Sequence, residues 1–479
     1  MSWQLPEYWA VVVLASDWAI RLGMLTIVPM RRGPTAAMAW LLLIFAFPWI
    51  GLAAYLLIGS TRLPRAREEQ RLRLVAHLDR LLVRLQGDEH VQRPALRPEF
   101  EGAIRLAERL GRMPIVAGNS AELLADYDGT IDRLVTDIDE ATDHVHLLFY
   151  IFADDATGRR IGEALARAAG RGVACRVMID TAGTGSATLR RLLPRLRAAG
   201  VEAHETLPLG VFRRKAARFD LRNHRKIAVI DARTGYTGSQ NIVDSFGDDE
   251  LWNDEMVVRL EGPIVLQLQA CFVADWYTES DELLDDPRLW PTPTARGTVA
   301  AQVLPSGPAF PSGSYLRLLV SLVHGAHERV ILTTPYFIPD EALTLALVSA
   351  VMRGVRVDLV VSKQLDSRLV ALAQESYYDE LLRGGVRVHR LRERFLHAKY
   401  ATIDDTIAVI GSGNLDIRSF RLNAEVSVVC YDAAVASQLR AEAERTIGKA
   451  ESLEAESWAG RGRALRAVQN VARLLSPLL

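Results

Sequence analysis

Two long apolar stretches begin the chain, and the second of them is the stronger signal. Residues 35–58 contain no charged side chain. A helix that rises about 1.5 Å per residue covers a hydrocarbon core of roughly 30 Å over this length. Buried core helices of soluble proteins are usually shorter. We therefore predict a transmembrane helix here, kinked at Pro48 because proline lacks the backbone N–H that a helix interior needs.

The first apolar stretch, residues 8–30, is interrupted by charge. Asp17 and Arg21 lie inside it at the i,i+4 spacing that lets two side chains pair on one helix face. Charges inside a membrane are costly, so this stretch could span the membrane, re-enter it or lie at its interface, and we favour spanning. Together the stretches predict a transmembrane helical hairpin, with residues 1–60 as the membrane anchor.

Basic residues after the second stretch determine the predicted orientation. Five arginines lie within residues 62–73, against Arg31 and Arg32 in the short loop between the stretches. Because basic residues accumulate on the cytoplasmic side, we predict a multi-pass protein whose large carboxy-terminal part is cytoplasmic. Residues 66–87 predict an amphipathic helix inside a linker of residues 61–114. That helix could lie on anionic lipid or pack on the globular part.

From about residue 115 the pattern changes to short apolar runs that alternate with helical ones, which is typical of an α/β fold. The order of elements then repeats. A cluster of Pro, Thr and Gly near residues 291–307 indicates the boundary, so we predict a first domain at 115–298 and a second at 299–479. The predicted strand–helix–strand units are 145–152, 155–170 and 175–179 in the first domain, and 330–337, 340–352 and 357–361 in the second.

A second amphipathic pattern ends the chain, over residues 461–475. Arg463, Arg466 and Arg473 alternate there with leucine and valine. Such a helix could contact anionic lipid or pack on the second domain, and the sequence leaves both interpretations open.

Composition narrows the class of protein. The chain has 479 residues, and its 57 Lys+Arg against 58 Asp+Glu leave a formal net charge of −1. Nucleic-acid enzymes usually carry a basic excess, so we expect no nucleic-acid partner. The three cysteines lie far apart in apolar runs and show neither a disulfide framework nor metal-ligand spacing. We expect buried, reduced thiols, no metal and no cofactor.

One pattern of polar residues occurs twice with identical internal spacing, H-x-K-x4-D-x6-G-S-x-N. One copy could arise by chance, but two copies in register, one in each half, need a chemical explanation. In an extended strand residues i and i+2 face the same side, so the histidine and lysine of each copy point together. The first copy contains His224, Lys226, Asp231, Ser239 and Asn241, and the second contains His397, Lys399, Asp404, Ser412 and Asn414.

These residue types suit an anionic phosphate substrate. An imidazole can attack phosphorus or transfer protons, a lysine neutralises charge, and Gly-Ser-x-Asn supplies a hydroxyl, an amide and backbone N–H groups. The apolar residues after each asparagine predict a helix start, whose N-terminus would add an anion site. Two half-sites face to face would surround one phosphate without a metal. Asp231 and Asp404 lie at predicted turns, where a structural salt bridge or turn cap is at least as good an interpretation as catalysis.

The duplicated string resembles the signature of the phospholipase D superfamily. Within that superfamily the chain is similar to the bacterial cardiolipin synthases. The resemblance implies two homologous α/β sandwich domains of the phospholipase D type, packed as a pseudo-dimer behind the membrane hairpin. The narrower match depends on residues 38–42 with Pro48 and Gly51, Tyr55 with Gly59, Tyr150-Ile151-Phe152, Asp180 with Gly183, Glu261-Gly262-Pro263, Asp275-Trp276, Ser306-Gly307-Pro308, Thr334-Pro335-Tyr336-Phe337 and residues 475–479.

The resemblance also implies a two-step transfer without a cofactor. One histidine attacks the phosphorus of phosphatidylglycerol and expels glycerol, which leaves a phosphatidyl-histidine. The other histidine protonates the glycerol and then deprotonates a second phosphatidylglycerol, whose attack yields cardiolipin. By analogy His224 is the nucleophile and His397 the acid and base, although the residues alone leave the roles interchangeable. The expected partners are phosphatidylglycerol and anionic lipid of the bacterial inner membrane.

The remaining site residues take supporting roles in this scheme. The lysines and asparagines of both motifs would bind the phosphate, with Ser239 and Ser412 in support. An acidic residue is expected to orient each histidine. The candidates are Glu255, 31 residues after His224, and Glu425, 28 residues after His397. The same site would also serve a phospholipase D-type hydrolase that releases phosphatidic acid, or a phosphatidylserine-type synthase with another acceptor. Near-neutral charge and the anchor argue against a nuclease, and two intact motifs argue against a membrane scaffold without enzymatic activity.

Overall fold

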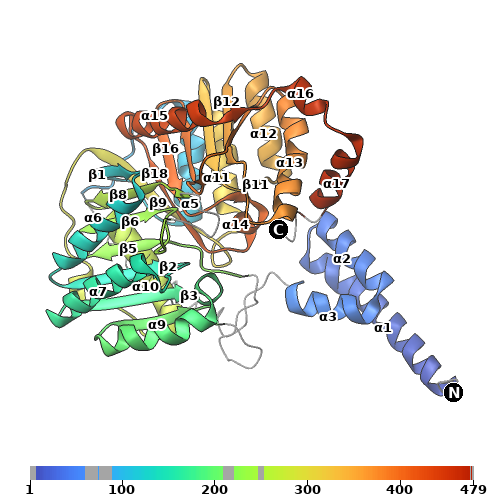
Figure 1. Ribbon diagram of the computed structural model, residues 1–479, viewed down its shortest axis with the longest axis horizontal. Helices are drawn as coiled ribbons and strands as arrows, with labels where there is room; N and C mark the ends of the chain where they lie inside the picture. The colour runs from blue at the N-terminus through green and yellow to red at the C-terminus, as the bar shows by residue number, and fades with distance from the viewer. Residues whose placement is uncertain are drawn as a thin grey trace. The chain divides into compact units, whose positions relative to one another are not determined.

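The computed structural model describes residues 7–59, 74, 89–208, 221–245, 253–474 and 476 (Figure 1). These residues belong to two compact units, an N-terminal unit within Met1–Pro64 and a body that carries the repeated motifs. The amphipathic helix predicted over residues 66–87 lies outside the described residues apart from Leu74 and stays a prediction.

Over residues 7–59 the N-terminal unit has three helices, α1 (Glu7–Arg31), α2 (Pro34–Ala46) and α3 (Pro48–Ile58). The prediction of one kinked helix over residues 35–58 is therefore wrong. Phe47 separates α2 from α3 with φ −137° and ψ 81°, because a residue before proline avoids the helical region. Pro48 then begins α3, where its missing N–H costs nothing.

The two short helices fold back on each other at Phe47. A Cβ atom added to Gly51 would come within 2.7 Å of the Cα of Ile44, so the close approach of α2 and α3 requires glycine. At the other end of the pair, Arg32 Nε donates a hydrogen bond to Gly59 O at 2.7 Å. The residue that follows α3 therefore lies beside the residues that precede α2, and α2 and α3 form a tight hairpin.

Among the described helices, α1 has the length and apolar composition needed to cross a membrane, from Tyr8 to Arg31. The helices α2 and α3, with 13 and 11 residues, are each too short. This result reverses the ranking expected from the sequence, in which the later stretch was the stronger candidate. A small apolar core holds the three helices together, formed by Met24, Val28, Ala37, Ile44 and Tyr55.

One 15-stranded sheet runs through the body. Its strands in the first half are β1 (Val116–Leu124), β2 (His144–Phe149), β3 (Ala174–Asp180), β4 (Glu202–Thr206), β5 (Ile227–Ile230), β6 (Thr234–Gly238) and β8 (Val257–Glu261). Those in the second half are β9 (Val299–Ser306), β10 (Arg329–Thr334), β12 (Arg356–Ser362), β13 (Arg387–Leu391), β15 (Tyr400–Ile403), β16 (Ile407–Gly411), β18 (Glu425–Cys430) and β19 (Glu451–Ser452).

The strand order shows the duplication. From one edge the order is β19-β13-β12-β10-β15-β16-β18-β9-β1-β8-β6-β5-β2-β3-β4. The run β13-β12-β10-β15-β16-β18 therefore matches β4-β3-β2-β5-β6-β8 strand for strand, and the antiparallel pair β1 and β9 joins the two runs. Two small parallel pairs lie outside this sheet, β7 (Asn253–Asp254) with β14 (Phe395–Leu396) and β11 (Phe337–Ile338) with β17 (Leu415–Asp416).

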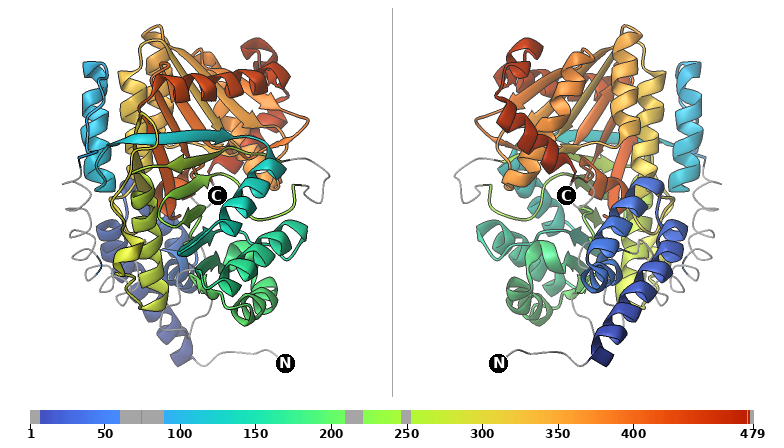
Figure 2. Two further views of the ribbon diagram at one scale, coloured as in Figure 1. Left: turned by 90° about the vertical axis from the view of Figure 1, so that its left-hand side faces the viewer. Right: turned by 90° about the vertical axis from the view of Figure 1, so that its right-hand side faces the viewer.

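Helices cover both faces of the sheet (Figures 1 and 2). Successive strand residues point to opposite faces, and Leu147 and Leu148 accordingly belong to different cores. On one face, α10 (Val265–Ser280) and α15 (Ala433–Lys449) share a core that extends through both halves. The other face has α6 (Tyr127–Asp139), α7 (Ala156–Gly170) and α9 (Ser186–Ala198) in the first half, and α11 (Ser314–Gly325), α12 (Glu341–Met352) and α13 (Arg368–Arg383) in the second.

The strand–helix–strand units predicted in each half are confirmed by β2-α7-β3 and β10-α12-β12. Part of the segment predicted as a linker belongs to the body instead. The short helix η1 (Pro98–Phe100) and α5 (Glu101–Gly111) pack in the core of the second half, where Phe100 is fully buried. The domain boundary at residues 298 and 299 stays a prediction, because β1 and β9 continue one sheet across it. Short helices complete the body: α8 (Thr181–Thr184), η2 (Pro287–Leu289), α14 (Ile417–Arg421) and α16 (Ala455–Ala459).

Candidate active site

Each motif histidine is fixed by a backbone segment from the other half of the body. The N–H of His224 donates to the carbonyl of Ala424 at 2.9 Å. The N–H of His397 donates in the same way to the carbonyl of Asp254 at 2.8 Å. These bonds bring the two motifs, which are far apart in the sequence, into one site where the halves meet.

These two backbone hydrogen bonds also place a buried glutamate against each imidazole. Glu425 follows Ala424 in the chain, and its Oε2 lies 3.0 Å from His224 Nδ1. Glu255 follows Asp254, and its Oε1 lies 2.7 Å from His397 Nδ1. The sequence located each glutamate by its distance after the histidine that precedes it, and the structure places each one on the other histidine. Both Nδ1 atoms are thereby held as hydrogen-bond donors, which leaves each Nε2 as the atom that can react.

The motif serines hold the glutamate segments in place. Ser412 Oγ donates to Glu425 Oε2 at 2.6 Å and accepts the N–H of Val426 at 3.0 Å. Ser239 Oγ accepts the N–H of Met256 at 2.9 Å, at the equivalent position after Glu255. We therefore infer that the serines act through the carboxylates and the backbone, and the phosphate contact expected of them stays a prediction.

The motif asparagines differ in how their side chains are engaged. Asn241 Oδ1 accepts the N–H of Ile151 at 3.2 Å, which ties the first motif to the loop after β2. Asn414 is also buried, but its Oδ1 has no hydrogen-bond partner among the described residues. A buried amide end without a partner is costly, so Asn414 has a polar atom available for a ligand.

Lys226 and Lys399 are almost completely buried, at 2% and 1% exposed. Each ammonium group donates to the carbonyl of the histidine two residues before it. Burial and the charge of Lys399 together lower the pKa of Lys226 to about 7, against the opposing effect of Glu425. Burial likewise lowers the pKa of Lys399 to about 8. Two buried cations side by side are unfavourable unless an anion joins them, so the site favours a phosphate.

The protonation states of the histidines and glutamates follow from burial and pairing. Burial lowers the pKa of His224 to about 4, against the opposing effect of Glu425. Burial lowers the pKa of His397 as well. Burial works to raise the pKa of both glutamates, yet their histidine partners hold it below the usual value. At neutral pH the site therefore contains carboxylates beside neutral imidazoles, which is the state in which an imidazole can attack or accept a proton.

Asp231 and Asp404 are the third residues of the motifs. Each follows the end of its strand, β5 or β15, whereas the motif histidine precedes the start of that strand. The carboxylate of Asp231 accepts three backbone N–H groups, from residues 142–144, at 2.8–2.9 Å. Asp404 accepts three in the same way from residues 327–329. These contacts fit the turn cap, and Asp404 also forms a salt bridge with Arg97. A catalytic role for either aspartate stays a prediction.

Among the described residues, the helix start expected after each motif is found in the second half and not in the first. Leu415 belongs to β17, and α14 begins two residues later with its N-terminus capped by the carboxylate of Asp416, which accepts from Ser419 N at 2.7 Å. In the first half, Ile242 forms a β-bridge with Phe152. An anion site at a helix N-terminus is therefore not supported by either segment.

Two residues with direct contacts to the site were not identified as site residues from the sequence. The ring of Tyr150 lies 4.8 Å from the ring of His224 and 5.3 Å from Lys226 Nζ. Arg225, between the motif histidine and lysine, donates to Asp275 Oδ1 at 2.6 Å and to Glu425 O at 3.1 Å. Tyr150 and Asp275 lie in segments that contributed to the family resemblance, but neither carries a signal of its own chemistry.

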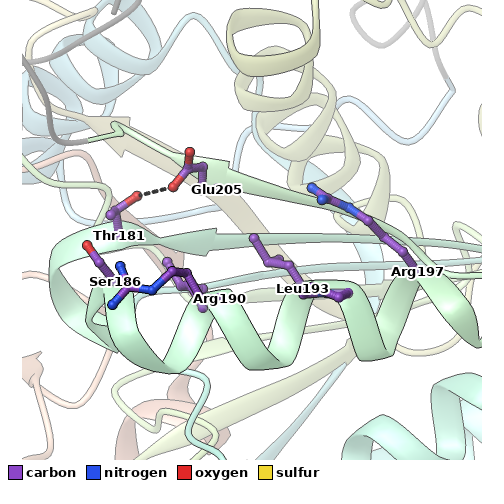
Figure 3. A pocket seen from close by; sticks show the side chains of 8 residues that line it. Thr181, Ser186, Arg190, Leu193, Arg197 and Glu205 are labelled. Atoms are coloured by element: carbon purple, nitrogen blue, oxygen red, sulfur yellow. Dashed lines mark hydrogen bonds between the residues drawn. The ribbon is translucent and has the colours of Figure 1, made fainter.

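A separate pocket of about 450 Å³ lies between α9 and β4 (Figure 3). No motif residue lines it, and Thr181 Oγ1 contacts Glu205 at 3.4 Å across it. Thr181 follows Asp180, whose carboxylate accepts the N–H of Asn223, so the pocket wall supports the segment that carries His224. Its lining residues are Thr181, Ser186, Leu189, Arg190, Leu193, Pro194, Arg197 and Glu205. Within the described ranges, no group of three or more His, Cys, Asp or Glu residues is arranged to hold a metal ion.

Known proteins align with almost the whole length of the chain. The family model "Cardiolipin synthase, PLD-like domain" matches residues 134–276 and 319–447, and the model "Phospholipase_D-nuclease N-terminal" matches residues 9–60. The chain is 34% identical to cardiolipin synthase A of Pectobacterium atrosepticum over 98% of each chain. It is also 34% identical to cardiolipin synthase A of Proteus mirabilis, over 96% of this chain and 97% of that one.

Solved structures show the same fold at lower identity. Phosphatidylserine synthase of Haemophilus influenzae superposes with a TM-score of 0.60 at 14% sequence identity. The superposition covers 79% of this chain and 100% of that one. At this sequence identity the superposition shows a likeness of fold. That likeness agrees with the duplicated α/β architecture described above.

Proposed function

This chain belongs to the cardiolipin synthase family of the phospholipase D superfamily, and on that basis we propose that it makes cardiolipin from two molecules of phosphatidylglycerol. The observation that carries the proposal is the pair of crossed His–Glu contacts, His224 with Glu425 and His397 with Glu255. Two oriented imidazoles beside two buried lysines provide a nucleophile, an acid–base group and an anion site at one phosphate.

In the first step, Nε2 of His224 attacks the phosphorus of phosphatidylglycerol. The P–N bond forms while the P–O bond to the terminal glycerol breaks, and His397 gives a proton to the glycerol oxygen. In the second step, His397 takes a proton from the hydroxyl of a second phosphatidylglycerol. That oxygen attacks the phosphorus, the P–N bond breaks, and cardiolipin leaves with His224 neutral again. One glycerol is released, and no cofactor is consumed.

The assignment of the two roles relies on superfamily analogy, and one contact supports it. His397 is neutral in the free site, so as the general acid it must gain a proton when the anionic substrate binds, before glycerol leaves. Glu255 lies 2.7 Å from the imidazole of His397, and a close carboxylate stabilises the imidazolium form. For the nucleophile, Glu425 and the carbonyl of Ser412 both receive the Nδ1–H of His224, at 3.0 and 3.1 Å. They direct the lone pair of Nε2 outward.

The lysines and Asn414 would stabilise the phosphate as negative charge develops on its equatorial oxygens. Lys226 and Lys399 need no reorganisation for this, since both are already held in the site by the histidine carbonyls. Preorganised charge in a site closed to water is the largest single contribution in many enzymes. The two halves of the body would act as a pseudo-dimer in which each half supplies one histidine, one lysine and the glutamate for the other half.

The anchor and its orientation form part of the proposal. With α1 across the bacterial inner membrane, the α2–α3 hairpin would enter and leave at one face, because Arg32 contacts Gly59. Arg31, Arg32 and the arginines of residues 62–73 would then all lie on that face. The positive-inside rule makes it the cytoplasmic face, which also places the body in the cytoplasm. This arrangement replaces two membrane spans with one span and a re-entrant hairpin.

Detergent-solubilised protein incubated with phosphatidylglycerol alone tests the proposed reaction. Mass spectrometry should detect cardiolipin and free glycerol. Phosphatidic acid as the main product would indicate a hydrolase instead, and phosphatidylserine formed on addition of serine would indicate the other synthase. His224→Ala and His397→Ala should each abolish turnover, whereas His324→Ala, an exposed histidine outside the motifs, should not. A phosphatidyl adduct that accumulates in His397→Ala and is absent from His224→Ala would identify His224 as the nucleophile.

A further inference from the structure

The last long helix of the body, α17 (Arg463–Arg473), turns its apolar side outward. Seven large apolar side chains are exposed on the described residues of the body, and four of them belong to α17 or its C-cap. They are Leu465, Val468, Val471 and Leu474, which are 45%, 51%, 62% and 77% exposed. We call these four side chains the α17 apolar face. A helix packed on a globular protein usually buries such a stripe and exposes its polar side, so this arrangement is inverted.

The polar side of α17 faces α13 instead. Gln469 Nε2 donates to Glu375 Oε2 at 2.8 Å. The guanidinium of Arg473 donates to Glu380 Oε2 at 3.3 Å and lies 4.2 Å from the ring centre of Tyr377. Gln469 is fully buried, so its amide needs this partner. These contacts fix the rotation of the helix about its axis and hold the α17 apolar face toward the outside.

We propose that the α17 apolar face docks into the interfacial layer of an anionic lipid bilayer. Residues 463–474 contain no acidic side chain, and the exposed Arg463 lies at the N-terminal end of the helix. An amphipathic helix of this composition binds a membrane surface through buried apolar area and attraction to anionic headgroups. The partner proposed for this face is the bilayer in which the chain itself would be anchored, because α1 is long and apolar enough to span a membrane. Tethering raises the effective concentration of lipid at the body.

Docking at this face has a consequence for the site. Ala472, on the inner side of α17, shares a small core with Ile338 and Tyr377. Ile338 pairs in β11 with Asp416 of β17, which lies just after Asn414 of the second motif. One packing layer thus separates α17 from the second phosphate-binding segment. A bilayer held at α17 would keep this edge of the site near the level of lipid headgroups.

A probe placed on either side of the helix tests the proposal in the full chain. Val471→Cys puts a thiol on the apolar face, and Asn470→Cys puts one at the adjacent exposed polar position, about 100° away around the helix axis. The three native cysteines are buried, so an environment-sensitive fluorophore should label the new thiol selectively. The labelled proteins are reconstituted into vesicles of phosphatidylcholine and phosphatidylglycerol that carry a spin label on the acyl chain.

Docking predicts that the probe at Val471 shifts to the blue and is quenched by spin-labelled lipid at least about twofold more than the probe at Asn470. Arg463→Glu in the Val471→Cys background should reduce that quenching, and vesicles without phosphatidylglycerol should do the same. Equal quenching at both positions would overturn the proposal. A blue shift at Val471 without lipid quenching would also overturn it, because it would indicate a second copy of the chain on this face. The readout requires no turnover, so its outcome is independent of the reaction proposed above.

Discussion

His224 and Glu425 are separated by 201 positions in the chain, yet the imidazole Nδ1 of one lies 3.0 Å from the carboxylate of the other. The backbone bond between His224 and Ala424 explains the contact, since it fixes the residue next to Glu425 beside the histidine. The relationship repeats between His397 and Glu255. Each histidine therefore depends on the half of the body that does not contain it.

Glu425→Gln tests this dependence. Glutamine keeps the shape but can present its amide N–H to His224 Nδ1, which favours the tautomer with the proton on Nε2. An imidazole in that tautomer has no lone pair at the attacking atom, so kcat should fall about 10²- to 10⁴-fold. Steady-state assays with phosphatidylglycerol measure the loss. Folding should be little changed, because Ser412 and Asn423 still have a polar partner at position 425.

The matching variant is Glu255→Gln, and the two should differ in the step that slows. If Glu425 serves the nucleophile, Glu425→Gln should suppress the first release of glycerol in rapid-quench experiments. Glu255→Gln impairs the acid and base, so both glycerol release and transfer to the second lipid should slow. Wild-type burst kinetics in Glu425→Gln would contradict the crossed assignment.

The buried lysines predict an alkaline limit to binding. The pKa of Lys226 is about 7 and that of Lys399 about 8 in the free protein, both lowered first by burial. As the pH rises through these values the cations are lost, and affinity for a phosphate should fall. A bound phosphate favours the charged lysines and raises both pKa values. We therefore expect kcat/KM to decline at lower pH than kcat.

Lys226→Arg provides the control for this profile. Arginine stays charged throughout the accessible range, so the residual alkaline decline should follow Lys399 alone and move to higher pH. Activity itself should drop, since a guanidinium does not reproduce the bond from Lys226 Nζ to the carbonyl of His224 at 2.8 Å. An alkaline limb at the same pH in wild type and Lys226→Arg would contradict the assignment to Lys226.

Local spacing was sufficient to place each motif histidine beside its lysine. Strand periodicity placed His224 and Lys226 together just before β5, and the repeat placed His397 and Lys399 just before β15. The sequence could not predict the crossed His–Glu pairing, because the partner of His224 is decided by how the two halves meet and not by any pattern near Glu425. For the same reason Tyr150 carried no signal, although its ring contacts His224.

The N-terminal stretch shows a different limit. Pro48 marked an interruption of the helix, but proline alone does not distinguish a kink from a reversal. The reversal depends on Gly51, three residues further on, because only glycine allows α3 to approach Ile44 so closely. The average composition of residues 35–58 does not reflect the single glycine on which the reversal depends, and it therefore favoured one continuous span.

Asp231→Asn should reduce stability more than chemistry. The carboxylate accepts backbone N–H groups of residues 142–144, and losing a charged acceptor costs about 1.5–3 kcal/mol. Asn tolerates the left-handed backbone at this position, where φ is 52°, so the variant isolates the carboxylate. Denaturant unfolding measures the loss, and kcat at low temperature should stay close to wild type. A large fall in kcat with unchanged stability would indicate a catalytic role for Asp231 instead.

The pH dependence gives this prediction a second test. Burial acts to raise the pKa of Asp231, but the backbone donors hold this pKa below its usual value of 3.8 in the folded protein. A carboxyl group with a lowered folded pKa contributes stability above the unfolded pKa, and that contribution is lost as the pH falls through the folded pKa. The stability difference between wild type and Asp231→Asn should therefore be full at neutral pH and shrink in acid below about pH 4.

The re-entrant hairpin makes a prediction about which residues share a membrane face. If α2 and α3 turn back at Phe47, single cysteines at Gly33 and Ser60 should react with a membrane-impermeant thiol reagent from the same side. A cysteine at Ser2, before α1, should react from the opposite side. Two full spans would instead place Gly33 opposite Ser60. Right-side-out and inverted membrane vesicles separate these outcomes, and the buried native cysteines allow the wild-type chain to serve as the unlabelled control.

Gly51→Leu should break the hairpin in the same assay. A side chain at this position would meet the Cα of Ile44 at 2.7 Å, so α2 and α3 would have to separate, which also weakens the contact from Arg32 to Gly59. The continuous stretch of residues 35–58 is then long enough to span. Labelling at Gly33 and Ser60 should become opposite, or mixed, in Gly51→Leu. Gly23→Leu is the matched control, because a Cβ at Gly23 meets nothing within 4 Å, and its labelling should follow that of the wild-type fold.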